Sequence, residues 1–305
     1  MNPTYINAVR LLLAVAPVVF RRSVFALKGG TAINLFLRDM PRLSVDLDLV
    51  YIDHRSGREE SLQAISAALE DIRDELQGLG FQCELGATAE GSEVKLFVQR
   101  DRARIKLEVN HVFRGTVLPV CEVALVSTAR DAFLTDIQVP VLHRDELYGS
   151  KLVAAMDRQH PRDLFDVLGL YAGEGLTPGI IECFVCYLAG HNRPVHEVLF
   201  ANEINIRSAF ANEFEGMTRD PVSLEVLLAT RRRFMDELPE LLSDNHRLFL
   251  AGLVRGEPDW QLMQCPHLEQ MPAIRWKLEN LSRLKRNNPA KFIRQAQALT
   301  ELLYR

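Results

Sequence analysis

The chain has 305 residues, of which 48% are hydrophobic and 25% are charged, and its formal net charge at pH 7 is −4. These values are typical of a globular protein and exclude a disordered or fibrous chain. The length allows two lobes, and the weakly negative total charge argues against general nucleic-acid binding by the whole molecule.

The cysteines and the apolar runs indicate the compartment. Five cysteines are an odd number without framework spacing, which is typical of a protein in the reducing cytoplasm. Cys183 and Cys186 form a CxxC pair, for which a zinc site with Cys265 is one alternative, but their apolar helical surroundings favour core packing. The apolar run 11–20 is too short to span a bilayer, and no later run reaches about twenty residues. We therefore predict a soluble, cytoplasmic protein without a membrane partner.

The predicted elements alternate between helices and strands in the first half of the chain. Hydrophobic periodicity predicts helices over residues 5–19, 31–38 and 58–79, and strands over 24–27, 45–52, 81–85, 94–99 and 104–109. A further strand is expected within 137–143, after which the pattern is helical. We predict an α+β fold with two domains, a first domain over 1–143 with a mixed sheet and a mostly helical domain over 144–305.

Two acids on the second predicted strand form the most informative motif. Side chains alternate along a strand, so Asp46 and Asp48 share one face. Apolar neighbours indicate an inner strand, where two carboxylates without a cation would be costly. Mg²⁺ prefers oxygen ligands and often combines protein carboxylates with substrate phosphates. The motif therefore predicts a Mg²⁺ site, which Mn²⁺ could also occupy.

A Gly-Gly turn precedes this strand. Gly29 and Gly30 have no Cβ, so a triphosphate can approach the backbone, and the helix beginning near Thr31 would direct N–H groups at its negative charge. A Gly-Gly pair alone is often a plain turn, and alternating acids alone often face solvent. Together they predict metal-dependent chemistry on a nucleotide.

A third acid lies on a later strand. Lys106, Glu108 and Asn110 share one face of that strand. Two-metal phosphoryl transfer needs an acid that assists the attacking hydroxyl, and Glu108 is the predicted third carboxylate of the metal and catalytic set. An ordinary solvent-facing strand is the alternative.

A charged cluster follows in two predicted helices that meet at a tight corner. Pro161 fits the first turn of the second helix, and Asp163 and Asp166 lie one turn apart on it. Lys151 and Arg158 can face the same way and stabilise the charge that develops on a leaving pyrophosphate. Asp166 could orient Lys151 through an ion pair. A helix hairpin with surface salt bridges is the plainer alternative.

These motifs together resemble the AbiEii/AbiGii nucleotidyltransferase toxins of the polymerase-β-like superfamily. The resemblance covers about residues 25–170, in order, and rests on Gly29-Gly30-Thr31-Ala32, Arg42 with Ser44-Val45-Asp46-Leu47-Asp48, Lys106-Leu107-Glu108-Val109, and Lys151 through Arg158 to Arg162-Asp163-Leu164-Phe165-Asp166. It implies a nucleotidyltransferase lobe and a helical lobe with an NTP bound between them. It also implies the role of toxin in a toxin–antitoxin or phage-defence pair.

The resemblance implies roles for the matching residues. Asp46 and Asp48 would hold the metal with Glu108 as the third acid, and Lys151 and Asp166 would be the functional pair of the helical motif. The residues expected to contact the nucleotide are Gly29, Gly30, Thr31, Arg42, Ser44, Arg158 and Arg162. Similar proteins add nucleotides to tRNA ends.

The predicted reaction is therefore Mg²⁺-dependent transfer of NMP from an NTP to RNA, with a tRNA 3′ end as the expected acceptor and a cognate antitoxin as a possible protein partner. Residues 273–305 contain eight Lys or Arg and two acids, a net charge of +6 (8 − 2), which favours RNA. The alternatives are nucleotidylation of a protein, a nucleotide-binding module without transfer, and a sugar-nucleotide glycosyltransferase. The last gives no reason for the Gly-Gly turn or the second charged cluster. The sequence does not identify the NTP base, the acceptor or the oligomeric state.

Overall fold

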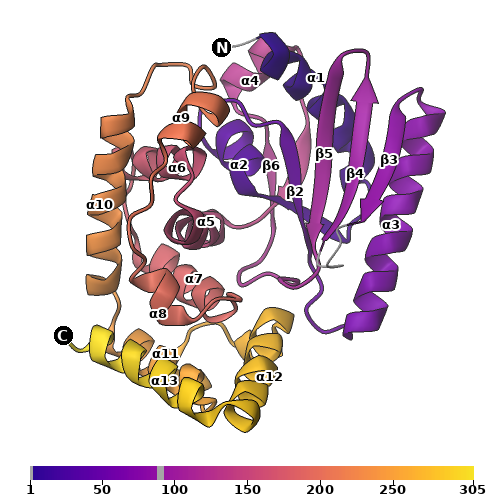
Figure 1. The fold of residues 1–305 in the computed structure, drawn as a ribbon. Coiled ribbons are helices and arrows are strands. Elements are labelled where there is room, and N and C mark those ends of the chain that lie inside the picture. The colour runs from indigo at the N-terminus through magenta and orange to yellow at the C-terminus, as the bar shows by residue number, and fades with distance from the viewer. Residues whose placement is uncertain (1–2, 88–92) are drawn as a thin grey trace. The chain divides into compact units, whose positions relative to one another are not determined.

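The computed structural model describes residues 3–87 and 93–305. The chain folds into two compact units (Figure 1). The first unit comprises Met1–Leu147 with Phe214–Pro221, and the second comprises Tyr148–Glu213 with Val222–Arg305. The chain thus passes from one unit to the other within helix α5 (Arg144–Arg158). The domain boundary between residues 143 and 144 stays a prediction.

A seven-stranded sheet with the order β3-β4-β5-β2-β1-β7-β6 forms the centre of the first unit. Its strands are β1 (Phe25–Lys28), β2 (Asp46–Tyr51), β3 (Gln82–Ala87), β4 (Glu93–Arg100), β5 (Ala103–Asn110), β6 (Cys121–Ala124) and β7 (Gln138–Val141). Strand β2 is antiparallel to β1 and parallel to β5, so the sheet is mixed, as predicted.

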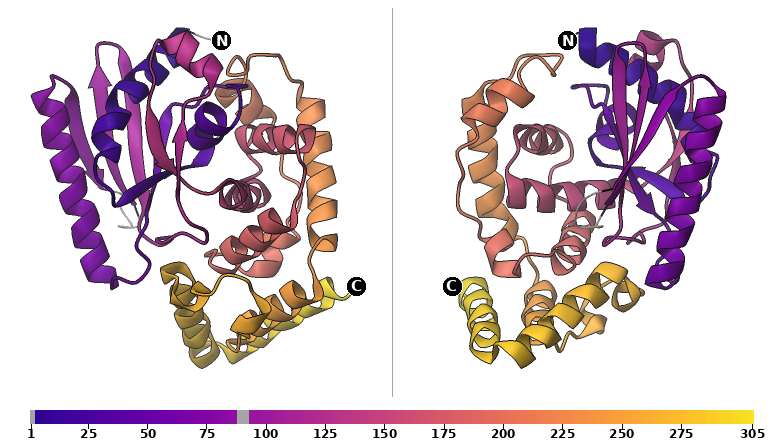
Figure 2. Two further views of the ribbon diagram at one scale, coloured as in Figure 1. Left: turned by 180° about the vertical axis from the view of Figure 1, so that it is seen from behind. Right: turned by 45° about the vertical axis from the view of Figure 1, so that its right-hand side comes forward.

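Helices α1 (Pro3–Phe20) and α3 (Arg58–Gly78) pack against one face of this sheet (Figure 2). Both carry apolar residues at helical spacing, and the strand residues that face them, such as Leu47, Leu107 and Val109, are fully buried. Because strand side chains alternate, burying these residues leaves Asp46 and Glu108 on the opposite face. The apolar pattern of the strands therefore determines the face on which the acids lie.

Three short elements of this unit differ from the prediction. The helix expected over 31–38 begins at α2 (Gly29–Thr31) and continues as a π-helix, η1 (Ala32–Leu37), a conformation often found near functional sites. Strand β6 and helix α4 (Ser127–Phe133) were not predicted. Strand β6 is a mostly exposed edge strand without polar–apolar alternation, and α4 has only 7 residues, too few for a clear period.

The described part of the second unit contains helices as its only regular elements, as predicted. After α5 they are α6 (Pro161–Ala172), α7 (Pro178–Ala189), α8 (Val195–Leu199), α9 (Arg207–Glu213), α10 (Leu224–Glu240), α11 (Asp244–Arg255), η2 (Trp260–Leu262), η3 (Leu268–Gln270), α12 (Pro272–Asn287) and α13 (Pro289–Leu303). Helices α6, α7, α12 and α13 each begin with a proline. The first N–H groups of a helix have no partner within it, so the missing N–H of proline costs nothing there. The α+β class with a helical C-terminal region is confirmed.

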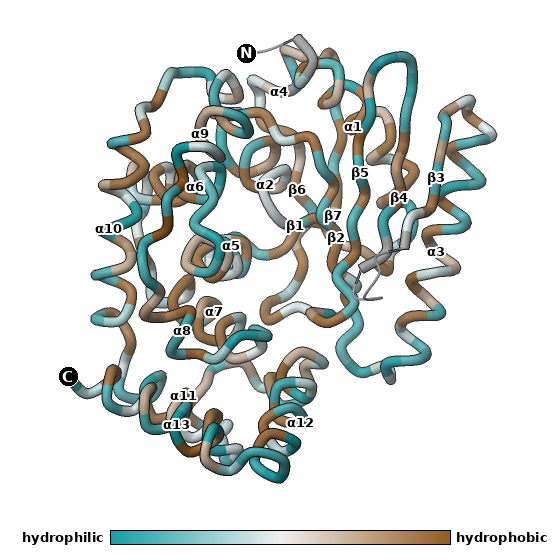
Figure 3. The backbone as a smooth tube through the Cα atoms, in the orientation of Figure 1, coloured by the Kyte–Doolittle hydropathy of each residue, from teal (hydrophilic) through white to brown (hydrophobic). Residues whose placement is uncertain are grey.

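Helix α7 forms the core of this unit and is largely hydrophobic in Figure 3. Cys183 and Cys186 are 1% and 0% exposed within it, so they are buried as predicted. The Glu182 carboxylate lies 2.9 Å from Nε2 of His246 and thereby links α7 to α11. None of the described helices combines the length and apolar character needed to cross a membrane.

Candidate active site

The Gly-Gly turn lies directly against the acid-bearing strand. Strands β1 and β2 pair so that Lys28, the residue before the turn, is opposite Asp48. Gly29 has a φ of +73°, in the left-handed region, and a Cβ built on it would lie 2.2 Å from Oδ2 of Asp48. No side chain fits there. The absence of a Cβ thus brings the turn backbone next to the carboxylate.

Arg42 and Ser44 lie against the second glycine. A Cβ on Gly30 would be 2.5 Å from Nη2 of Arg42 and 3.1 Å from Oγ of Ser44. The Arg42 side chain is 2% exposed, and its Nη1 donates a hydrogen bond to the Leu43 carbonyl at 3.1 Å. Four residues predicted to contact the nucleotide, Gly29, Gly30, Arg42 and Ser44, are therefore gathered at one turn.

A segment distant in sequence pairs with the backbone at Arg42 and Leu43. Residues 214–221 belong to the first unit, and Thr218 forms an isolated β-bridge with Arg42. The Leu43 N–H also donates to the Met217 carbonyl at 3.0 Å. No local sequence signal indicates this pairing, because the two segments are far apart along the chain.

Thr31 has a structural role in this turn. It is fully buried, and its hydroxyl donates a hydrogen bond to the main-chain carbonyl of Asp46. Asn34, which is also fully buried, donates from Nδ2 to the Gly30 carbonyl at 2.9 Å. These bonds hold the start of the helix against β2. A contact between Thr31 and phosphate would therefore involve its backbone rather than its hydroxyl.

The three predicted acids lie on one face of the sheet. Strands β2 and β5 are in parallel register, with Asp46 opposite Lys106 and Asp48 opposite Glu108. All four residues are half-buried. Among the described residues, no group of three or more His, Cys, Asp and Glu side chains is arranged to hold a metal ion. Asp46 and Asp48 are thus a pair of candidate ligands on one strand.

Glu108 is ion-paired with two lysines. Its Oε1 lies 2.8 Å from Nζ of Lys95 on β4, and its Oε2 lies 2.6 Å from Nζ of Lys106. Burial alone would lower the pKa of Lys106, but the carboxylates of Glu108, Asp46 and Asp48 outweigh it, so the pKa is raised. Sequence analysis missed Lys95, because only the pairing of β4 with β5 brings it opposite Glu108.

In the second unit, α5 and α6 carry a buried charged cluster. Nζ of Lys151 lies 3.0 Å from Oδ2 of Asp166 and 3.1 Å from Oδ1 of Asp163. Arg158 approaches Asp163 with two nitrogens, Nε at 2.6 Å and Nη2 at 2.9 Å. The predicted ion pair between Lys151 and Asp166 is present. Asp163, for which the sequence suggested no separate role, joins both cations.

Burial distinguishes this cluster from a surface salt bridge. The side chain of Lys151 is 7% exposed and those of Asp163 and Asp166 are each 1% exposed, whereas Arg158 is 56% exposed. Burial alone would raise the pKa of Asp163, but Lys151 and Arg158 hold that pKa well below its usual range. The alternative of a hairpin held by surface salt bridges is therefore wrong for Lys151 and the two aspartates.

The corner between α5 and α6 positions Arg162. Gln159 has a φ of +49°, and His160 caps α6 by accepting the Arg162 N–H at its Nδ1, 3.1 Å away. Gln159 is 1% exposed and its Oε1 accepts the Ile204 N–H at 3.1 Å. The Nε of Arg162 is buried and has no hydrogen-bond partner among the described residues. The Gln159 and His160 hydrogen bonds thus hold the backbone of the corner from which Arg162 extends.

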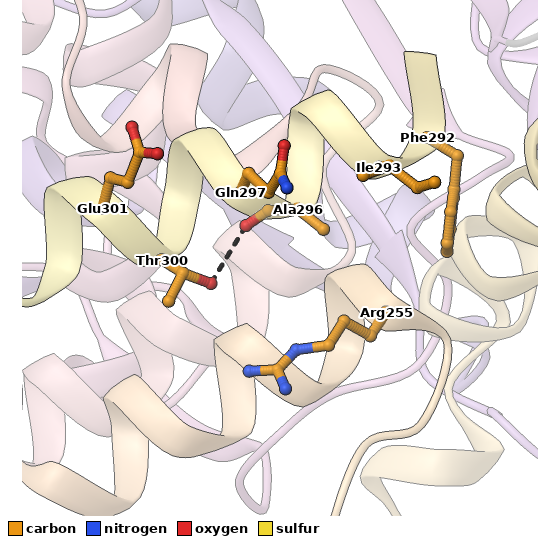
Figure 4. A pocket seen from close by; sticks show the side chains of 7 residues that line it. All are labelled: Arg255, Phe292, Ile293, Ala296, Gln297, Thr300 and Glu301. Atoms are coloured by element: carbon orange, nitrogen blue, oxygen red, sulfur yellow. Dashed lines mark hydrogen bonds between the residues drawn. The ribbon is translucent and has the colours of Figure 1, made fainter. Parts of the chain in front are cut away.

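A pocket of about 430 Å³ lies between α11 and α13 of the same unit (Figure 4). Both apolar and polar side chains line it, namely Arg255, Phe292, Ile293, Ala296, Gln297, Thr300 and Glu301. None of these is a predicted site residue, and the pocket carries no pair of acids. It is therefore not a candidate for metal-dependent chemistry.

Comparisons with known proteins identify the family and a similar fold. Residues 10–280 match the family described as nucleotidyl transferase AbiEii toxin, type IV TA system. The fold is similar to that of MenT4, a nucleotidyltransferase toxin from Mycobacterium tuberculosis H37Rv, with a TM-score of 0.59, 19% identity, and coverage of 89% of this chain and 92% of MenT4. A search of curated proteins found no match. Because the family match spans most of its length, the chain belongs to the AbiEii nucleotidyltransferase toxins of type IV toxin–antitoxin systems.

Proposed function

We propose that this toxin transfers an NMP group from an NTP to an RNA acceptor, using a divalent cation held by Asp46 and Asp48. The observation that carries the proposal is the contact between the Gly29 turn and the Asp48 carboxylate, where a Cβ would lie 2.2 Å from Oδ2. At this place the carboxylate that we propose for the cation adjoins the turn whose backbone we propose for the phosphates.

The residues present fit a hard divalent cation, for which we propose Mg²⁺ with Mn²⁺ as a possible substitute. Asp46 and Asp48 offer oxygen ligands from one strand face, half-buried rather than enclosed. The remaining ligands would come from phosphate oxygens and water. When bound, the cation would neutralise charge on the phosphates and polarise the phosphoryl group.

The transfer is a displacement at the α-phosphorus of the NTP. A hydroxyl oxygen of the acceptor forms the new O–P bond, the bond from the α-phosphorus to the bridging oxygen breaks, and pyrophosphate leaves. The hydroxyl proton passes to a base. In this scheme, the backbone at Gly29 and Gly30 and the side chains of Arg42 and Ser44 bind the phosphates and orient the NTP.

We assign a second part of the machinery to the charged cluster of α5 and α6. Lys151 is held between Asp163 and Asp166, so its ammonium group has a defined position, and Arg158 extends from the cluster with half of its side chain exposed. We propose that Lys151, Arg158 and Arg162 stabilise negative charge on the NTP phosphates, with Asp166 orienting Lys151.

The choice of RNA, with a tRNA 3′ end as the expected acceptor, is supported by the charge of the C-terminal helices. Residues 280–300 contain five basic and no acidic residues, and all five are exposed: Arg283, Lys285, Arg286, Lys291 and Arg294. Such a surface favours a phosphate backbone. A cognate antitoxin follows from the family, and a role in phage defence stays a prediction.

The proposal is tested by incubating the purified protein with Mg²⁺, each α-³²P-labelled NTP in turn and total tRNA. We expect label in tRNA from one NTP, and none with an Asp46→Asn protein. Label in a polypeptide would show that the acceptor is a protein and not RNA. NTP binding without any transfer, to tRNA or to protein, would favour the binding module.

A further inference from the structure

Three charged side chains from neighbouring strands share a sheet face with Asp46 and Asp48. Lys95 on β4 is paired with Glu108 on β5, and Lys106 is paired with Asp46 on β2. Paired positions point to the same side of a sheet, so these five side chains form one surface. It belongs entirely to the first unit.

Both carboxylate oxygens of Glu108 are engaged, Oε1 by Lys95 at 2.8 Å and Oε2 by Lys106 at 2.6 Å. To serve as a metal ligand, Glu108 would have to give up at least one of these charge-assisted bonds. The carboxylate instead has the geometry of a clamp that holds two ammonium groups beside the acid pair.

The two lysines retain access to solvent. The side chains of Lys95 and Lys106 are 26% and 28% exposed, whereas that of Glu108 is 17% exposed. The carboxylate is therefore more buried than the two lysines. An ammonium group has three donors, which is more than an ion pair with Glu108 alone requires. The surface can therefore present positive charge outward.

The charge balance of this surface depends on a cation. Two lysines and three acids give a net charge of −1 (2 − 3), and one divalent cation at the acid pair changes it to +1 (−1 + 2). Opposite charges attract strongly at partly buried sites. An anionic group is therefore favoured on this face when the acid pair holds its cation.

We propose that Lys95 and Lys106 form a phosphate-binding site beside the acid pair and that Glu108 is their positioning residue, rather than the third metal ligand predicted from the sequence. This inference rests on the proposed nucleotidyl transfer at the same face. The ligand chemistry is a phosphate group, which either the NTP or the RNA backbone can supply.

The first experiment measures binding of a non-hydrolysable NTP analogue with Mg²⁺, and of tRNA, by Lys106→Gln and Lys95→Gln proteins. We expect affinity for one of the two ligands to fall about 10- to 100-fold, as for loss of a bond to a charged group. A fall for the analogue identifies the NTP as the phosphate source, and a fall for tRNA identifies the RNA backbone. Unchanged affinity for both would overturn the proposal.

Arg102→Gln is the matched control, because it removes one positive charge from the exposed turn between β4 and β5. Lys106→Arg should retain most of the affinity, since it keeps the charge. Thermal unfolding of each protein reports its folding. If Lys106→Gln does not fold, Lys95→Gln decides the outcome, because its side chain lies on a different strand.

The second experiment tests whether Glu108 positions the two lysines or binds the metal ion. We expect Glu108→Gln to weaken binding of the same ligand as the lysine variants do. Once both lysines are replaced, Glu108 has no ammonium group left to position, so adding Glu108→Gln to the Lys95→Gln/Lys106→Gln protein should cause no further loss. The Mn²⁺ affinity, measured by electron paramagnetic resonance, should be unchanged in Glu108→Gln. A tenfold weaker Mn²⁺ affinity would overturn the positioning role. Loss of Mn²⁺ binding in Asp46→Asn tests the proposed function separately.

Discussion

The two charged groups of this protein are built in opposite ways. On the sheet face, Asp46 and Asp48 stand half-buried on one strand, and the local charge is negative. In the α5–α6 cluster, Lys151 and Arg158 balance Asp163 and Asp166, and three of the four side chains are buried. The first group carries a net negative charge, whereas the second is already neutral. Changes in the first should therefore affect activity, and changes in the second should also affect stability.

The largest effect on activity should follow from Asp46→Asn. It removes one of the two proposed cation ligands while keeping the size of the side chain, so we expect transfer to fall by about a thousandfold or more. The measurement is label transfer at saturating NTP, with the thermal midpoint as the check on folding. Full activity with an unchanged midpoint would refute the role of the acid pair.

A second large effect should follow from Gly29→Ala, because the new Cβ would lie 2.2 Å from Oδ2 of Asp48 at a φ of +73°. Gly80→Ala is a matched control in the same unit, since Gly80 has a φ of +83° and no atom near its Cβ position. Both should lose about 1 kcal/mol of stability from backbone strain.

Only Gly29→Ala should also lose transfer activity, by about a hundredfold, because the Asp48 carboxylate must move away from its place at the turn. Equal activity of the two alanine proteins would show that the contact between turn and carboxylate is not needed.

An intermediate effect, on stability, should follow from Asp163→Asn. The change leaves Lys151 and Arg158 without their shared carboxylate, and breaking a buried ion pair in this way costs about 3–5 kcal/mol. Chemical denaturation at pH 7 measures the loss. A difference below about 1 kcal/mol would mean that the cluster is not a stabilising unit.

The same residue gives a pH dependence with a definite sign. The pKa of Asp163 is lowered from 3.8, so the native state favours its charged form. The resulting stability is fully present above the unfolded pKa and is lost as the pH falls through the folded value. The wild-type protein should therefore lose more stability than Asp163→Asn when the pH is lowered below 3.8.

The smallest effect should come from single charges of the C-terminal helices. Arg286→Gln and Lys291→Gln should each weaken tRNA binding a few-fold and lower the slope of log K against log salt by about 0.7–0.9. Arg10→Gln, an exposed change on α1, is the control. If the slopes equal that of the wild type, the basic residues of the C-terminal helices no longer support RNA as the acceptor.

Much of the fold could be predicted because its signals are local. Apolar periodicity indicates α1, α3 and most strands, and a proline at the first turn indicates the start of α6. The ion pair between Lys151 and Asp166 was also predictable, because helical spacing determines which side chains of α5 and α6 can meet at a short corner. Strand β6 and helix α4 lack such a period and were missed.

The sequence by itself determined the acid pair, the glycine turn and the charged helical motif, because these depend on residues close together in the chain. Only the tertiary structure decided what these groups contact. The register of β4 with β5 brings Lys95 to Glu108, and the segment 214–221 pairs with Arg42. Burial, which gives Asp163 its low pKa, is likewise a property of the packed helices. Such contacts join residues distant in sequence, so no local pattern specifies them.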